Sequence, residues 1–143
     1  MKSAAQILKS KPQQAVETVT PSTSVFDALK RMAEKNIGAL LVMEDAKIAG
    51  IFTERDYARK VILMGRSSKE TPVSEIMTFP VMYVRPDQSN EECMALMTDK
   101  HVRHLPVVDN GKLIGLISIG DLVKDIMSEQ QFVIDQLKQY ISG

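Results

Sequence analysis

The sequence contains an internal duplication, and this feature limits the possible folds more than any other. Residues 16–60 align with residues 81–125 without a gap, at a constant offset of 65 residues. The identical aligned pairs include a proline, a glycine and an aspartate: Pro21/Pro86, Gly50/Gly115 and Asp56/Asp121. Self-similarity at a fixed spacing indicates one supersecondary unit that occurs twice. We therefore divide the chain into residues 1–72, the first repeat with a short leading helix and a linker; residues 73–128, the second repeat; and residues 129–143, a C-terminal helix.

Each repeat predicts the element order β-α-β-β-α. A short strand at 16–19 or 81–84 is followed by a helix whose N-terminus carries a Ser-x-x-acid capping box, at Ser24 or Ser89. Two apolar strands come next, and in the second repeat Asn110-Gly111 between them predicts a tight hairpin turn. The second helix begins near Asp56 or Asp121.

One such repeat has too few elements to bury a stable core alone. We therefore expect an α/β (α+β) fold in which two repeats pack face to face about a pseudo-two-fold axis. This packing would create two related clefts, and ligand sites favour such internal interfaces. The last helix, at 128–141, has apolar residues mostly on one side. It either packs on the rest of the chain or contacts a second copy, and the sequence leaves both open.

Composition excludes several classes of function. Lysine plus arginine and aspartate plus glutamate each total 18, so the chain lacks the basic excess of a duplex-binding protein. No apolar run approaches the roughly 20 residues that span a bilayer, and the N-terminus is too polar for a secretory signal. The single cysteine, Cys93, suits a reducing compartment, so we expect a cytoplasmic protein. Cys93 aligns with Ala28, which predicts a small buried apolar side chain.

Two aligned tetrads stand at the junction of the third strand and the second helix: Thr53-Glu-Arg-Asp56 and Ser118-Ile-Gly-Asp121. A Ser/Thr-x-x-Asp at a helix start is a capping box, and capping alone explains both residue types. A second interpretation is a ribose phosphate site. A helix N-terminus attracts phosphate, and a carboxylate one turn later accepts the hydroxyls of a ribose. Both interpretations stay open on the tetrads alone.

The segments around these tetrads resemble the signature of cystathionine-β-synthase (CBS) domains. Gly50-Ile-Phe-Thr-Glu-Arg-Asp56 and Gly115-Leu-Ile-Ser-Ile-Gly-Asp121 both match its pattern of a strand glycine, two apolar residues and Thr/Ser-x-x-Asp. Arg103-His104-Leu-Pro-Val-Val-Asp109 resembles the second-strand motif of the family. The resemblance covers about residues 4–127, and two copies in tandem form a Bateman module. Members of the family bind AMP, ADP, ATP, NAD or S-adenosylmethionine, and some bind no ligand.

The resemblance also implies the site residues, because each cleft joins the tetrad of one copy to segments of the other. The first implied nucleotide site comprises Thr53, Arg55, Asp56, Phe79, Pro80, Val81, Val102, Arg103 and His104. The second implied site comprises Ser118, Asp121, Val16, Thr20, Ile37 and Gly38. Two arginines and a histidine serve the first site, and arginine binds phosphate through charge-assisted, bidentate contacts. We therefore expect the Asp56 cleft to be the main nucleotide site and the Asp121 cleft to be weaker, empty or suited to a less charged adenosine group.

These observations predict a regulatory module rather than an enzyme. The sequence has no Gly-x-Ser-x-Gly, Walker or Gly-x-Gly-x-x-Gly motif, and only two histidines, which argues against a metal site at His101-x-x-His104. We expect a homodimer that binds an adenine nucleotide (AMP, ADP, ATP or NAD(H), with AMP or NAD(H) favoured) and acts on a separate, unidentified protein. No catalytic cofactor, metal, nucleic acid or membrane is expected. The alternative is a ligand-independent dimerisation or scaffold module.

Overall fold

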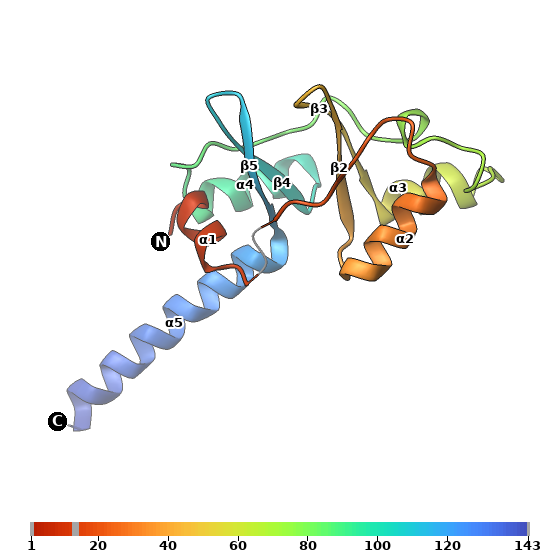
Figure 1. Ribbon diagram of the computed structural model, residues 1–143. Coiled ribbons are helices and arrows are strands. Elements are labelled where there is room, and N and C mark those ends of the chain that lie inside the picture. The colour runs from red at the N-terminus through yellow and green to blue at the C-terminus, as the bar shows by residue number, and fades with distance from the viewer. Residues whose placement is uncertain (1, 13–14, 143) are drawn as a thin grey trace. The chain divides into compact units, whose positions relative to one another are not determined.

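The chain forms two compact units, and each unit contains one of the repeats. The computed structural model describes residues 2–12 and 15–142 (Figure 1). Unit 1 comprises Met1–Ala15 with Tyr83–Gly143, and unit 2 comprises Val16–Met82. Helices and small sheets occur in both units, which confirms the mixed α+β class. The pseudo-two-fold packing of the repeats stays a prediction.

Unit 2 has the order of elements that the first repeat predicts. Its three-stranded sheet has the order β1-β2-β3, with β1 parallel to β2 and β2 antiparallel to β3. Helix α2 and the segments around α3 complete the unit, and the apolar side chains between them form one buried core. The elements are β1 (Thr18–Val19), α2 (Val25–Lys35), β2 (Ala39–Glu44), β3 (Lys47–Thr53), α3 (Glu54–Tyr57), the π-helix η1 (Ala58–Ile62) and the 3₁₀-helix η2 (Val73–Glu75).

Unit 1 repeats this plan with a shorter first strand and a longer last helix. The strand predicted at 81–84 is reduced to one parallel bridge between Val84 and Val107. The separate C-terminal helix predicted at 128–141 is wrong, because α5 continues from the second helix of the repeat without a break. No glycine or proline occurs between Asp121 and Ser142 to end it. The elements are α1 (Ala4–Ser10), α4 (Asn90–Lys100), β4 (His104–Asp109), β5 (Lys112–Ser118) and α5 (Ile119–Ser142).

The short helices that lead each repeat pack with the other repeat. Helix α1 precedes the first repeat but belongs to unit 1, where the Ala4 N–H donates to the Gln88 carbonyl at 2.8 Å. Segment η2 precedes the second repeat but belongs to unit 2, where the Val73 N–H donates to the Thr23 carbonyl at 2.8 Å. The compact units therefore differ from the sequence boundaries drawn at 1–72 and 73–128. The reason is that the apolar side chains of both segments are buried in the core of the unit that they join, Ala4 and Ile7 in unit 1 and Val73 and Ile76 in unit 2.

The glycine of each signature motif is required by a close approach. A Cβ atom on Gly50 would lie 2.5 Å from Met77 Sδ, and one on Gly115 would lie 2.5 Å from Leu8 Cδ2. Met77 follows η2 and Leu8 lies in α1, so each glycine receives a side chain from the leading segment of its unit. Only a residue without a side chain leaves room for this contact.

Several local predictions are confirmed. Ser24 and Ser89 cap α2 and α4, and each accepts a hydrogen bond from the N–H three residues later. Asn110 and Gly111 have φ of 50° and 79°, as a type I′ turn requires. Cys93 and Ala28 are fully buried, and burial, with a smaller contribution from Glu92, raises the pKa of the Cys93 thiol.

Among the helices of the described residues, none has the length and apolarity needed to cross a membrane.

Candidate functional site

The first tetrad of unit 2 is a capping box at the end of β3. The Thr53 N–H and hydroxyl donate to Asp56 Oδ2 at 3.0 and 3.1 Å, and the Asp56 N–H donates to Thr53 Oγ1 at 3.2 Å. The capping interpretation of this tetrad is therefore confirmed. These bonds also fix the positions of one hydroxyl and one carboxylate relative to the sheet.

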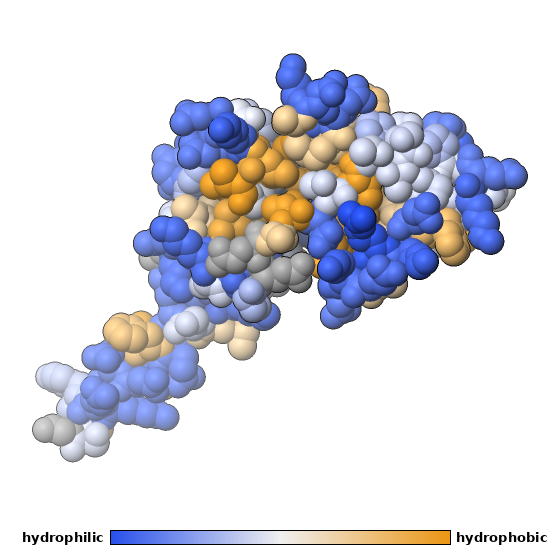
Figure 2. All heavy atoms as spheres, viewed as in Figure 1, coloured by the Kyte–Doolittle hydropathy of each residue, from blue (hydrophilic) through white to orange (hydrophobic). Residues whose placement is uncertain are grey.

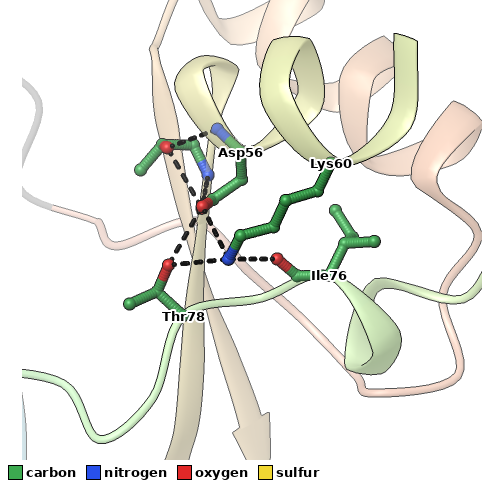
Figure 3. Close-up of polar contacts among 5 residues, drawn as sticks. Asp56, Lys60, Ile76 and Thr78 are labelled. Carbon is green, nitrogen blue, oxygen red and sulfur yellow. Dashed lines mark hydrogen bonds and ion pairs between the residues drawn. The ribbon is translucent and has the colours of Figure 1, made fainter. Parts of the chain in front are cut away.

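The other oxygen of this carboxylate has two further partners (Figure 3). The Thr78 hydroxyl donates to Asp56 Oδ1 at 3.0 Å, and Lys60 Nζ lies 3.2 Å from the same atom. Lys60 Nζ also donates to the Ile76 carbonyl at 3.1 Å, so the lysine is held from two sides. The carboxylate thus accepts four contacts, which is about its full capacity. Asp56 itself is only 7% exposed.

The second tetrad, in unit 1, has the same design. The Ser118 N–H donates to Asp121 Oδ2 at 2.8 Å, and the Asp121 N–H donates to Ser118 Oγ at 3.2 Å. Lys11 Nζ lies 3.0 Å from Asp121 Oδ2 and donates to the Leu116 carbonyl at 2.8 Å. Each unit therefore presents a hydroxyl, a carboxylate and a lysine anchored to a main-chain carbonyl.

The two lysines come from different places in the sequence, and sequence reasoning missed both. Lys60 follows Asp56 by four residues, a spacing at which helical side chains meet, and this signal was available. At the repeat offset, however, Lys60 aligns with Asp125, so the second repeat has no matching lysine. Lys11 follows α1 and reaches Asp121 only through the tertiary packing of that helix.

Asp125 belongs instead to a buried polar pair that joins α4 to α5. Asn90 Nδ2 donates to Asp125 Oδ2 at 2.7 Å and to the Leu122 carbonyl at 3.0 Å. Lys2 Nζ lies 4.0 Å from Asp125 Oδ1. Asn90 and Asp125 are both buried, so this pair is a structural contact rather than an open site.

His104 lies in unit 1, at the start of β4, where its backbone pairs with Ser118 of β5. Burial lowers the pKa of its imidazole below the usual value of 6.5. The Asp121 carboxylate opposes this shift, and the Lys11 and Arg103 charges add to it. At neutral pH, His104 is therefore a neutral hydrogen-bonding group, and any phosphate contact that it makes is weaker than the ion pair expected from a charged imidazole.

The implied site residues, taken together, divide between the units. Unit 1 contains five of them: Val102, Arg103, His104, Ser118 and Asp121. Unit 2 contains the other ten: Val16, Thr20, Ile37, Gly38, Thr53, Arg55, Asp56, Phe79, Pro80 and Val81. Phe79 directly follows Thr78, so the segment implied to contact the base is tied to the Asp56 carboxylate within one unit. The joining of the two sets into shared clefts stays a prediction.

Residues 2–12 and 15–142 contain no group of three or more histidine, cysteine, aspartate or glutamate side chains that could hold a metal ion.

Comparison with known proteins gives matches along most of the chain. The CBS domain family matches residues 5–62 and 73–128. The chain is 43% identical over 129 residues to the mitochondrial CBS domain-containing protein CBSX3 of Arabidopsis thaliana. The aligned region covers 87% of this chain and 63% of that protein. It is 36% identical over 115 residues to the CBS domain-containing protein YhcV of Bacillus subtilis, and the aligned region covers 80% of this chain and 81% of YhcV. The chain thus spans less than two thirds of the length of CBSX3.

Solved structures give the same result. A protein from Burkholderia ambifaria described as a signal-transduction protein with CBS domains is 62% identical, with a TM-score of 0.87 over 90% of this chain and 96% of that chain. The hexameric CBS-CP12 protein of bloom-forming cyanobacteria is 33% identical, with a TM-score of 0.76 over 85% of this chain and 66% of that chain.

Proposed function

Because this chain belongs to the CBS domain family, we propose that it is a regulatory module that binds an adenine nucleotide through its two Thr/Ser-x-x-Asp tetrads. The Burkholderia ambifaria relative is described as a signal-transduction protein with CBS domains, which supports a regulatory rather than a catalytic role for this chain. The ligand in this proposal is AMP, ADP, ATP or NAD(H), with AMP or NAD(H) favoured. The module acts in the cytoplasm, as a homodimer, on a separate protein.

The observation that carries the proposal is the set of groups at each tetrad. A carboxylate accepts the two hydroxyls of a ribose, as acidic residues do in dinucleotide-binding folds. A lysine lies about 3 Å from that carboxylate and can contact a phosphate once it exchanges its present partners. Both units hold this combination although their lysines have different origins in the sequence, which supports a function beyond capping.

A related structure adds support. The CBS domain pair of protein MJ0100 has been solved in complex with 5′-methylthioadenosine and S-adenosylmethionine. That pair is 24% identical to this chain, so the likeness extends to the fold. It supports the proposal that a CBS pair of this fold accepts an adenosine group.

Binding requires an exchange of partners at Asp56. Its acceptor positions are filled by Thr53, Thr78 and Lys60, so ribose hydroxyls must replace the last two at Oδ1. Lys60 then becomes free to move toward a phosphate. Since a ligand shifts a conformational equilibrium only through its different affinities for two states, this exchange is the proposed origin of the regulatory signal.

We keep the Asp56 site as the main one. Arg55 is on the same unit and Arg103 and His104 would be added by the second repeat, so this site gathers more groups for phosphate than the Asp121 site does. His104 contributes a hydrogen bond rather than a charge at neutral pH, because its pKa is lowered.

The test is calorimetry and thermal unfolding with AMP, ADP, ATP, NAD, NADH and S-adenosylmethionine. A ligand at about 100 times its dissociation constant stabilises the fold by about 2.7 kcal/mol, which raises the melting temperature by several degrees. We expect Asp56→Ala to abolish this shift and Asp121→Ala to leave most of it. The matched control is Ser89→Ala, which removes a capping box of the same kind away from the tetrads and leaves the ligand shift intact. Loss of binding in Asp121→Ala but not in Asp56→Ala would reverse the ranking.

One observation favours the alternative of a ligand-independent dimerisation or scaffold module. The Asp56 carboxylate is fully satisfied by protein groups, as a purely structural cap would be. This function predicts no ligand-induced shift for any compound, together with lower stability of both aspartate variants.

A further inference from the structure

The C-terminal half of α5 is an exposed apolar surface. The buried residues of this helix are Leu122 and Asp125, and every residue from 130 to 142 is exposed. Figure 1 shows this half running away from α1, α4 and the strands of its own unit. The match to the CBS domain family ends at residue 128, so residues 129–142 of this helix lie outside the matched domain.

Its apolar side chains follow the spacing of a helix that packs against another helix. Met127, Ile134 and Ile141 are seven residues apart, and Leu137 lies between the last two. Val133 and Tyr140 widen the stripe on one flank, and all of these side chains are exposed. Figure 2 shows pale orange apolar side chains between hydrophilic ones along this part of the helix. A seven-residue apolar repeat is typical of helices that associate side by side.

An open hollow lies on the same half of α5, on the flank of the stripe that Val133 and Tyr140 form. It is lined by Phe132, Val133, Gln136, Leu137, Gln139 and Tyr140. Three of these residues belong to the stripe, so a side chain of a facing helix can be received beside it.

We propose that this stripe, Met127–Ile141, packs against the same stripe of a second copy of the chain. This inference deepens the proposed homodimer by naming its surface, and it rests on that part of the proposed function. The exposed apolar side chains of the stripe present on the order of 100 Å² each, hence roughly 600 Å² in all, comparable with the about 800 Å² that each partner buries in a standard interface. They are Met127, Val133, Ile134, Leu137, Tyr140 and Ile141.

Charge favours a second copy over a lipid surface. The segment 127–142 contains three charged residues, Glu129, Asp135 and Lys138, and only the last is basic. Amphipathic helices that bind membranes are rich in lysine and arginine. None of the three lies among the stripe residues, so two copies can meet there without opposing like charges.

Helix stability supplies a second argument. Most of the stability of helices in proteins comes from tertiary packing of an amphipathic face rather than from helix propensity. The exposed end of α5 continues a helix that is anchored at Leu122 and Asp125, but this end lacks tertiary packing of its own in its unit. Burial of the stripe against a partner helix would supply the missing stabilisation.

The experiment is sedimentation velocity of the full chain over a concentration series. The test variants are Leu137→Glu and Val133→Glu, which place a charge in the stripe. The matched control is Ser128→Glu, which adds the same charge at an exposed position outside the stripe. We expect a dimer for the wild type and the control, and a dissociation constant raised by at least about 30-fold for both stripe variants. Unchanged melting of the two units verifies that the stripe variants fold.

The outcomes separate this inference from the proposed function. A dimer that is equally tight in all four proteins overturns this interface and leaves the proposed homodimer intact. A monomeric wild type at every concentration overturns both. Co-sedimentation of a monomeric wild type with anionic vesicles, lost in Leu137→Glu, would make the stripe a membrane-surface helix. None of these outcomes decides nucleotide binding, which the aspartate variants test separately.

Discussion

His104 links burial to the pH dependence of stability at the scale of a single residue. Its folded pKa is lowered, chiefly by burial, while in the unfolded chain the imidazole titrates near 6.5. As the pH falls through 6.5, the unfolded state therefore takes up the proton first. The contribution of this residue to stability is present above pH 6.5 and is lost progressively below it.

We expect His104→Gln to reduce the loss of stability between about pH 7.5 and pH 5.5, since the substitution removes this titration. The measurement is the urea midpoint of unfolding at both pH values. His101→Asn is the control, because it removes the other, exposed histidine and places asparagine, which tolerates the left-handed backbone of this position. An unchanged slope in His104→Gln would show that carboxylates rather than this imidazole govern the pH dependence.

At the scale of elements, the two hairpins show how the same turn is made with different residues. Asn110 and Gly111 adopt positive φ, and the aligned Asp45 and Ala46 do the same, with φ of 50° and 64°. Left-handed backbone costs a non-glycine residue about 1–2 kcal/mol, and an added glycine costs about 0.5–1 kcal/mol in chain entropy. The hairpin of the first repeat is therefore the less favourable of the two.

The Ala46→Gly variant should consequently be more stable than the wild type, by up to about 1 kcal/mol. Gly111→Ala makes the opposite substitution at the aligned position of the second hairpin, and this variant should be less stable than the wild type. Chemical denaturation of both variants measures the two free energies of unfolding. A destabilised Ala46→Gly would mean that the entropy of the unfolded chain outweighs the backbone strain.

The contact between α1 and β5 gives a second prediction at this scale. A Cβ on Gly115 meets Leu8 Cδ2 and Cδ1 at 2.5 and 2.6 Å, so Gly115→Ala should cost about 1–3 kcal/mol through overpacking. Gly120→Ala is the control, because its added Cβ would lie 3.5 Å from Ser118 Oγ and alanine favours a helix.

A double-mutant cycle identifies the cause. If the cost comes from Leu8, the Leu8→Ala substitution should recover part of it in the Gly115→Ala background. Additive free energies in the two variants would locate the strain elsewhere.

For the whole molecule, the exchange of leading segments is the main consequence of the duplication. Each repeat folds with the segment that leads the other one, α1 in unit 1 and η2 in unit 2. Each tetrad in turn draws groups from the segment that joins its unit: Lys11 for Asp121, and Thr78 with the Ile76 carbonyl for Asp56 and its lysine. A change at either tetrad therefore acts on a segment joined covalently to the other repeat, which suits a module that transmits a signal.

Much of this molecule follows from the sequence alone. The repeat offset predicts the order β-α-β-β-α, which unit 2 confirms, while in unit 1 the first strand is reduced to the bridge of Val84 with Val107. Ser24 and Ser89 predict the helix starts and Asn110-Gly111 predicts the turn, and the structure confirms these. The capping bonds of Thr53 and Ser118 are equally local. These features depend on residues a few positions apart, so short-range backbone and hydrogen-bonding preferences suffice to determine them.

Only the tertiary structure decided which distant segments meet. Lys11 reaches Asp121 across 110 positions of sequence, and the roles of Gly50 and Gly115 depend on Met77 and Leu8 from the leading segments. The buried pair of Asn90 and Asp125 likewise joins two helices. Local periodicity carries no record of such contacts, because they arise when apolar faces from separate segments are buried together and the polar groups brought with them must find partners.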